Sequence, residues 1–107
     1  MGRKTREKIL VVEHDASMGY LLTTLLEGEG YHVRLVSDGQ EGLTIYKPDT
    51  YDLCILDVMM PKMDGFALAK RLREIDPYVR FLFLTARTLK EDMLQGFALG
   101  AEDYIRK

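Results

Sequence analysis

Cysteine, proline, tryptophan and long apolar runs are all scarce in this chain of 107 residues. It has one cysteine, three prolines and no tryptophan. Cys54 lies inside an apolar run, which is typical of a small buried side chain in a reducing compartment. No apolar run approaches the roughly 20 residues that cross a bilayer, and the basic segment before Ile9 is followed by too short an apolar stretch for a signal peptide. We therefore expect a cytoplasmic protein with no membrane segment.

A strong charge of either sign is also missing. Lysine and arginine number 15, aspartate and glutamate 17, and the formal net charge is −2. There is no electrostatic basis for nucleic-acid binding by this segment. With 47% hydrophobic and 30% charged residues, the composition is that of a globular protein and excludes a disordered one. We expect a basic leader over residues 1–8 and one folded domain over residues 9–107.

Four short apolar runs each end at a polar group suited to handling phosphate. The runs cover residues 9–12, 53–56, 81–84 and 104–105. Such short runs are typical of strands buried on both faces in a parallel sheet, and ligands bind beyond the carboxyl ends of those strands. We expect a site at that edge in which a carboxylate accepts a phosphoryl group. The polar groups that follow the runs are Glu13, His14, Asp15, Asp57, Thr85 and Lys107.

Between the first two strands, apolar spacing predicts an amphipathic helix capped by Ser17 and ended by Gly28 and Gly30. The alternation after it predicts a half-exposed edge strand over residues 31–35, with His32 facing solvent. The positions expected to face the sheet from the helix are Met18, Leu21, Leu22, Leu25 and Leu26.

Capping residues predict three more helices. Asp38 and Asp64 open helices that end before Pro48 and Pro77, and a capping box from Thr88 opens one that ends at Gly100. The inward positions expected for the helix after Asp64 are Phe66, Leu68, Leu72 and Ile75.

Strands that alternate with helices predict a doubly wound α/β fold. We expect a five-stranded parallel sheet in the flavodoxin-like order 2-1-3-4-5. The first and third strands are then neighbours, so the acids at positions 13 and 15 converge with Asp57. Because the chain stops at Lys107, we expect the fold to be truncated before its last helix.

Taken together, these motifs resemble the receiver domain of two-component response regulators over essentially the whole chain. The resemblance lies in four ordered segments, 8–15, 51–65, 83–86 and 100–107, with sequences KILVVEHD, YDLCILDVMMPKMDG, FLTA and GAEDYIRK. It implies a signalling switch, and not a turnover enzyme, that receives a phosphoryl group from a histidine kinase or phosphotransfer protein. It also implies an output domain outside this chain; a winged-helix DNA-binding domain is the expectation by analogy.

The resemblance assigns a role to each residue of the predicted site. Asp57 is the phosphoacceptor, Thr85 and Lys107 contact the phosphate, and Thr85 with Tyr104 forms the switch pair. The ligands implied for Mg²⁺ are Glu13, Asp15, Asp57 and the backbone carbonyl of Met59.

His14 departs from the family pattern, which has an acid at this position that often binds the metal directly. Imidazole suits Zn, Ni, Cu or Fe, whereas Mg²⁺ requires oxygen ligands, so we expect weakened Mg²⁺ binding. Three hypotheses follow. His14 swings out to solvent while Glu13 and Asp15 hold Mg²⁺; or His14 becomes imidazolium beside Asp57 and partly replaces the metal's charge; or the chain is a pseudo-receiver that binds partners without being phosphorylated.

The expected missing helix leaves one sheet face covered only by the first helix. We therefore expect lower stability or association with another chain, through that face or through the surface of the fourth helix and fifth strand.

Two other classes of protein fit the sequence less well. An aspartate-based phosphohydrolase has a second Asp where Met59 stands, and in a flavin-binding module the acids at 13 and 15 would repel the cofactor phosphate.

Overall fold

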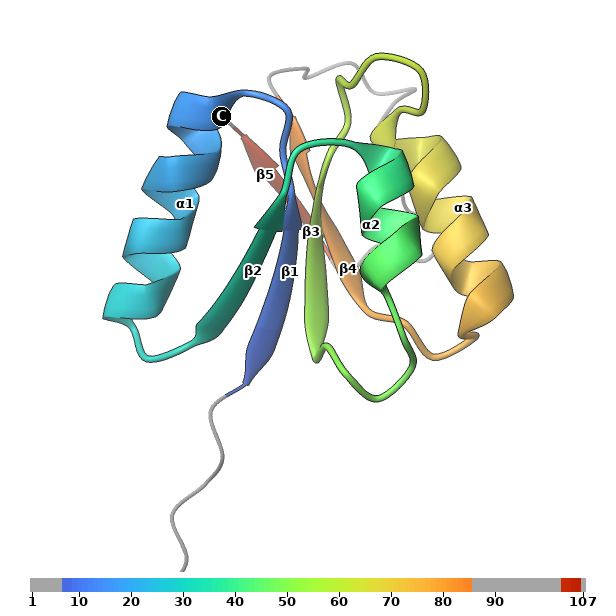
Figure 1. Cartoon of the computed structure of the whole chain (residues 1–107), viewed down its shortest axis with the longest axis horizontal. Helices are drawn as coiled ribbons and strands as arrows, with labels where there is room; N and C mark the ends of the chain where they lie inside the picture. Colours follow the sequence, from blue (N-terminus) through green and yellow to red (C-terminus); the bar gives the residue numbers. More distant parts are fainter. Residues whose placement is uncertain (1–6, 86–102, 107) are drawn as a thin grey trace, which may run out of the picture.

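A parallel sheet with helices on both faces forms the molecule (Figure 1). The computed structural model describes residues 7–85 and 103–106, with side chains described for residues 7–84. The helix expected between Thr88 and Gly100 lies outside the described residues. The elements are β1 (Lys8–Val12), α1 (Ala16–Gly28), β2 (His32–Val36), α2 (Gly39–Ile45), β3 (Leu53–Asp57), α3 (Gly65–Ile75), β4 (Phe81–Thr85) and β5 (Asp103–Arg106).

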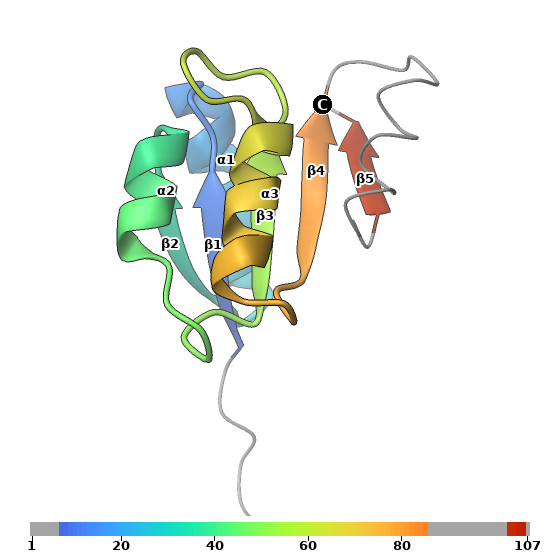
Figure 2. The ribbon, with the colours of Figure 1, turned by 90° about the vertical axis from the view of Figure 1, so that its right-hand side faces the viewer.

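The strand order in the sheet is β2-β1-β3-β4-β5, and every neighbouring pair is parallel. Helix α1 covers one face, and α2 and α3 lie together on the other, as the turned view shows (Figure 2). The expected flavodoxin-like parallel architecture is therefore confirmed. Because β1 and β3 are neighbours and run in the same direction, the segments that leave them, at Glu13 and Val58, emerge side by side.

The alternation of side chains along β1 separates the core into two halves. Leu10 and Val12 belong to the cluster under α2 and α3, whereas Ile9 and Val11 belong to the smaller cluster under α1. These residues are fully or almost fully buried, as expected for a strand covered on both sides. In the larger cluster the Phe83 ring packs edge to face on Phe66, with the ring centroids 4.8 Å apart.

Asp38 and Asp64 cap α2 and α3 as predicted. The Asp38 carboxylate accepts a hydrogen bond from the backbone N–H of Glu41 at 2.7 Å, and the Asp64 carboxylate accepts one from Ala67 at 2.8 Å. The cap predicted for α1 is wrong: Asp15, not Ser17, precedes that helix and accepts a bond from the N–H of Met18 at 3.1 Å. The helix starts earlier than expected because Asp15 supplies this acceptor.

Three apolar positions expected to face inward are exposed instead. Leu21 and Leu25 of α1 are 50% and 59% exposed, and Ile75 at the end of α3 is also exposed. In α1 the buried stripe is shifted, because Gly19 has no side chain and lets the helix approach Leu35 of β2 closely. The α1 side chains that do pack on the sheet are those of Met18, Leu22 and Leu26.

The burial predicted for Cys54 and the edge position predicted for the second strand are confirmed. Cys54 is completely buried in β3, and burial raises the pKa of its thiol to about 12, so it is a packing residue and not a reactive one. β2 lies at the edge of the sheet, and His32 is exposed. In the part of the chain that the structure describes, no helix has the length and apolar character needed to cross a membrane.

Candidate functional site

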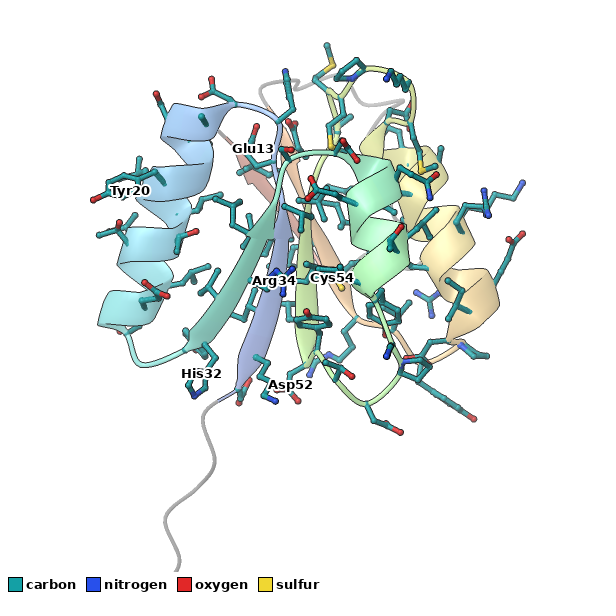
Figure 3. All side chains as sticks on the ribbon, in the orientation of Figure 1. Glu13, Tyr20, His32, Arg34, Asp52 and Cys54 are labelled. Carbon is teal, nitrogen blue, oxygen red and sulfur yellow. The ribbon has the colours of Figure 1, made fainter. Side chains whose placement is uncertain are left out.

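The carboxyl end of β1 places Glu13 inside the protein. Backbone pairing continues one residue past the strand, since the N–H of Glu13 donates to the carbonyl of Val36 at 3.1 Å. The side chain is only 2% exposed, and its Oε2 accepts a hydrogen bond from the backbone N–H of Asp15 at 2.9 Å. Figure 3 shows Glu13 at the upper edge of the sheet, opposite the edge that carries His32 and Asp52. Glu13 is thus a buried acid held in a fixed orientation.

Asp57 is the last residue of β3 and is completely buried. Its Oδ1 accepts a hydrogen bond from the backbone N–H of Met59 at 3.0 Å. The next residue, Val58, donates its N–H to the carbonyl of Leu84 in β4 at 3.0 Å, so the chain stays anchored to the sheet just beyond the carboxylate. This leaves Oδ2 to face the segment after β1.

His14 reaches Oδ2 from that segment. Its Nδ1 lies 2.8 Å from Asp57 Oδ2 and 3.7 Å from Glu13 Oε2. The His14 side chain is 43% exposed, so one side of the ring faces solvent while Nδ1 faces the two acids. In this structure the His14 ring is not turned away to solvent, because the Asp57 carboxylate offers it a hydrogen-bond partner at the strand end.

Glu13, His14 and Asp57 form one group of possible metal ligands. One nitrogen or oxygen atom from each residue lies within 4.8 Å of the others. Asp15 is not in this group; its Oδ1 accepts the N–H of Met18 at the start of α1. The structure thus brings together two of the acids implied by the resemblance, with the histidine as the third donor.

The loop after Asp57 is held against the sheet by a glycine. The N–H of Gly65 donates to the carbonyl of Val58 at 3.1 Å, and a Cβ at position 65 would clash with the carbonyl oxygen of Asp57. In the sequence, Asp64 indicated only the start of a helix, and this second role of Gly65 was not predicted. Its only signal in the sequence is a glycine directly after a cap residue, shortly after the predicted strand end.

Met59 and the ends of β4 and β5 lie at the same edge of the sheet. Met59 is exposed, and its backbone orients Asp57 through the N–H described above. Asp57 is in register with Leu84, so Thr85 follows one position further along β4. Tyr104 is in register with Phe83. The side chains of Thr85 and Tyr104, and the whole of Lys107, lie outside the described residues.

The sequence model of the response regulator receiver domain matches residues 9–107 of this chain. The chain belongs to this family. Similar proteins agree with that assignment. The transcriptional regulatory protein RprY of Bacteroides fragilis is 48% identical over 100 residues, which cover 94% of this chain and 42% of RprY. This receiver domain thus spans less than half the length of that curated relative.

Solved structures support the same membership. The non-phosphorylated receiver domain of HemR from Leptospira biflexa matches with a TM-score of 0.90 and 36% identity, covering 95% of this chain and 82% of that one. The response regulator TrrA of Thermotoga maritima, in complex with Mg²⁺-BeF, matches with a TM-score of 0.84 and 32% identity, covering 94% of this chain and 86% of that one.

The donor set of this receiver domain fits Mg²⁺ only in part. The two buried carboxylates offer the oxygen ligands that Mg²⁺ requires. The third donor is an imidazole nitrogen, which Mg²⁺ does not favour, and it already contacts the Asp57 oxygen that faces it.

Proposed function

We propose that this receiver domain is a phosphorylation-dependent switch that accepts a phosphoryl group on Asp57 from a histidine kinase or phosphotransfer protein. One observation carries the proposal: Asp57 is completely buried at the strand end, its carboxylate is oriented by the N–H of Met59, and Oδ2 lies within a group of titratable side chains. A buried acid with fixed orientation and a charged neighbour is typical of a functional carboxylate.

The chemistry requires positioning and charge neutralisation. A carboxylate oxygen and a phosphoryl donor are both anionic, so they repel each other unless a cation lies nearby. In the transfer, an oxygen of Asp57 forms the bond to phosphorus while the bond between phosphorus and the donor's leaving atom breaks. The hydrogen bond from Met59 holds Oδ1, so the geometry of the acceptor is set before the donor arrives.

We assign the remaining roles by membership in the family. Glu13, Asp15, Asp57 and the carbonyl of Met59 would hold a Mg²⁺ ion, with His14 lowering its affinity. When bound, the ion supplies positive charge next to the transferred group. Thr85 and Lys107 would donate to the phosphate oxygens. The strand register supports this assignment, because Asp57 is paired with Leu84 and Thr85 is the next residue of β4.

The phosphate would change the surface around β5. The phosphoryl group on Asp57 carries roughly 1.5 to 2 negative charges and three strong acceptor oxygens, in place of the single charge of the carboxylate. These oxygens would draw the Thr85 hydroxyl inward and give the Tyr104 ring space to turn. A change of charge at Asp57 would thereby change the shape of the surface near Tyr104. Both residues lie in strands of the same sheet, in adjacent positions of the order.

We further propose that the receiver domain over residues 9–107 controls an output domain. RprY is named as a transcriptional regulatory protein, and the matched region covers 42% of its length. A winged-helix DNA-binding domain, and dimers formed through the surface of β5 or through the α1 face, are the corresponding proposals for this protein. Exposed Leu21 and Leu25 support the second surface.

The experiment is phosphorylation by a small phosphodonor, followed by intact mass measurement at several divalent-ion concentrations. We expect one added phosphoryl group in the wild type and none in Asp57→Asn. Asp52→Asn is the matched control, because this exposed residue lies at the opposite edge and should label normally. A wild type that gains no phosphoryl group, or an Asp57→Asn variant that labels equally well, would contradict the proposal.

A further inference from the structure

At position 14 the family pattern has an acid, whose oxygen could bind a metal ion. His14 offers a ring nitrogen there instead, next to Asp57 and Glu13. Its Nδ1 is 2.8 Å from Asp57 Oδ2 and 3.7 Å from Glu13 Oε2. Ligand atoms that surround one Zn²⁺ ion tetrahedrally, with bonds near 2.1 Å, are about 3.4 Å apart. These two distances lie on either side of this value, and one ligand atom from each of the three residues lies within 4.8 Å of the others, so side-chain movements would bring the three around one ion.

Backbone groups hold both carboxylates, Asp57 through the oxygen away from His14 and Glu13 through the oxygen that faces His14. The N–H of Met59 holds Asp57 through Oδ1, and the N–H of Asp15 holds Glu13 through Oε2. Hydrogen bonds of this kind orient metal-binding carboxylates and reduce the entropy lost when the ion binds. Both acids are almost completely buried, and buried carboxylates are stable when they are paired or bind a metal.

The half-exposed His14 ring leaves the solvent side of the group accessible. A site with three protein ligands and one open position is typical of Zn²⁺ sites that exchange a water ligand. Nitrogen together with carboxylate oxygen favours borderline transition ions, whereas Mg²⁺ prefers oxygen alone and loses its water reluctantly. For Mg²⁺ to use Asp57 Oδ2 it would have to displace the imidazole, whereas a transition ion would bond to both atoms.

We infer that Glu13, His14 and Asp57 form a mixed nitrogen and oxygen site that binds a divalent transition ion of the Zn²⁺ type in preference to Mg²⁺. A metal ion bound at Nδ1 takes the place of the proton that Nδ1 would donate to Asp57. The ring proton is therefore on Nε2 in the metal-bound form. The inference uses the carboxylates of the proposed phosphorylation site, but it concerns the protein before any phosphoryl transfer.

The test is a titration of the untagged chain, labelled with ¹⁵N in its histidines, with Zn²⁺ and separately with Mg²⁺. The chain has only two histidines, and exposed His32, at the opposite edge of the sheet, is the internal control. We expect Zn²⁺ to shift the Nδ1 signal of His14 and move its proton to Nε2, while His32 is unchanged. Zn²⁺ should bind at least about tenfold more tightly than Mg²⁺ by calorimetry. Equal affinities, or a shift confined to His32, would overturn the inference.

A variant pair sharpens the result. His14→Asp restores an all-oxygen donor set and should lower Zn²⁺ affinity at least about tenfold while raising Mg²⁺ affinity. His32→Asp should leave both affinities unchanged. Unchanged Zn²⁺ binding in His14→Asp would overturn the inference. Because the wild-type titration needs neither a variant nor a phosphodonor, the inference can fail while Asp57 is phosphorylated, and can hold if it is not.

Discussion

The imidazole of His14 lies against the carboxylate of Asp57, with 2.8 Å between Nδ1 and Oδ2. The two residues are far apart in sequence and meet because β1 and β3 are adjacent parallel strands. The contact places a nitrogen donor where the family pattern has an acid. The identity of residue 14 should therefore influence which ion assists the proposed phosphoryl transfer.

His14→Asp should change how phosphorylation depends on Mg²⁺. An added carboxylate supplies a hard oxygen ligand, so the Mg²⁺ concentration that gives half-maximal labelling by a small phosphodonor should fall at least about tenfold. Mass spectrometry over a Mg²⁺ titration measures this concentration. His32→Asp makes the same change of charge at the opposite edge and should leave the midpoint where it is. An unaltered midpoint in His14→Asp would show that position 14 does not influence Mg²⁺ binding.

Gly65→Ala should destabilise the protein and disturb the site. The new Cβ would clash with the carbonyl oxygen of Asp57, a rigid backbone group, so the loop has to move. We expect a loss of about 1 to 3 kcal/mol in the free energy of unfolding, from urea denaturation. Gly28→Ala is the matched control, since nothing lies within 4 Å of a Cβ there and alanine favours a helix. Equal stability of the two variants would show that the loop accommodates a side chain at Gly65.

Leu68→Ala should be costly because the side chain is completely buried between α3 and the sheet. Removing it leaves a cavity, and we expect a loss of about 2 to 5 kcal/mol in the free energy of unfolding. Leu25→Ala makes the same chemical change on the exposed side of α1 and should alter stability by about 0.5 kcal/mol or less. Comparable losses in both variants would mean that Leu25 is covered in solution.

The free energy of unfolding should fall as the pH rises above 9. Burial raises the pKa of the Cys54 thiol from 9.0 to about 12, so the unfolded chain loses this proton at a lower pH than the folded one. The folded state then binds more protons, and stability decreases with a slope of about 1 kcal/mol per pH unit between pH 9 and 10. In Cys54→Ala this part of the slope should disappear, as measured by urea denaturation at several pH values. The same slope in the variant would assign the effect to another group.

Local signals predicted the strands, two of the caps and the parallel architecture. The apolar runs at β1, β3 and β4 are short and bounded by polar residues, and Asp38 and Asp64 cap helices through nearby N–H groups. The rotation of α1 was not predictable from periodicity alone, because it depends on the close approach of Gly19 to Leu35 across the edge of the sheet. Leu21 and Leu25 therefore appeared to be core positions.

The residues that form the site could be predicted from the sequence, but the contacts between them could not. Strand order implied that Glu13 and Asp57 would converge, and they do. The direction of the His14 ring was not encoded in any local pattern, since it follows from an acceptor on another strand. For the same reason, no local pattern predicted that the backbone N–H of Asp15 would donate to Glu13 while its carboxylate caps α1.

The most direct test of the account is chemical mapping of the phosphoryl group. The chain is phosphorylated by a small phosphodonor, reduced with borohydride, which converts an aspartyl phosphate to homoserine, and digested for peptide sequencing by mass spectrometry. We predict homoserine at position 57 and unmodified aspartate at positions 15, 52 and 64. Homoserine at another position, or none anywhere in the presence of Mg²⁺ or Zn²⁺, would contradict the assignment of Asp57 as the phosphoacceptor.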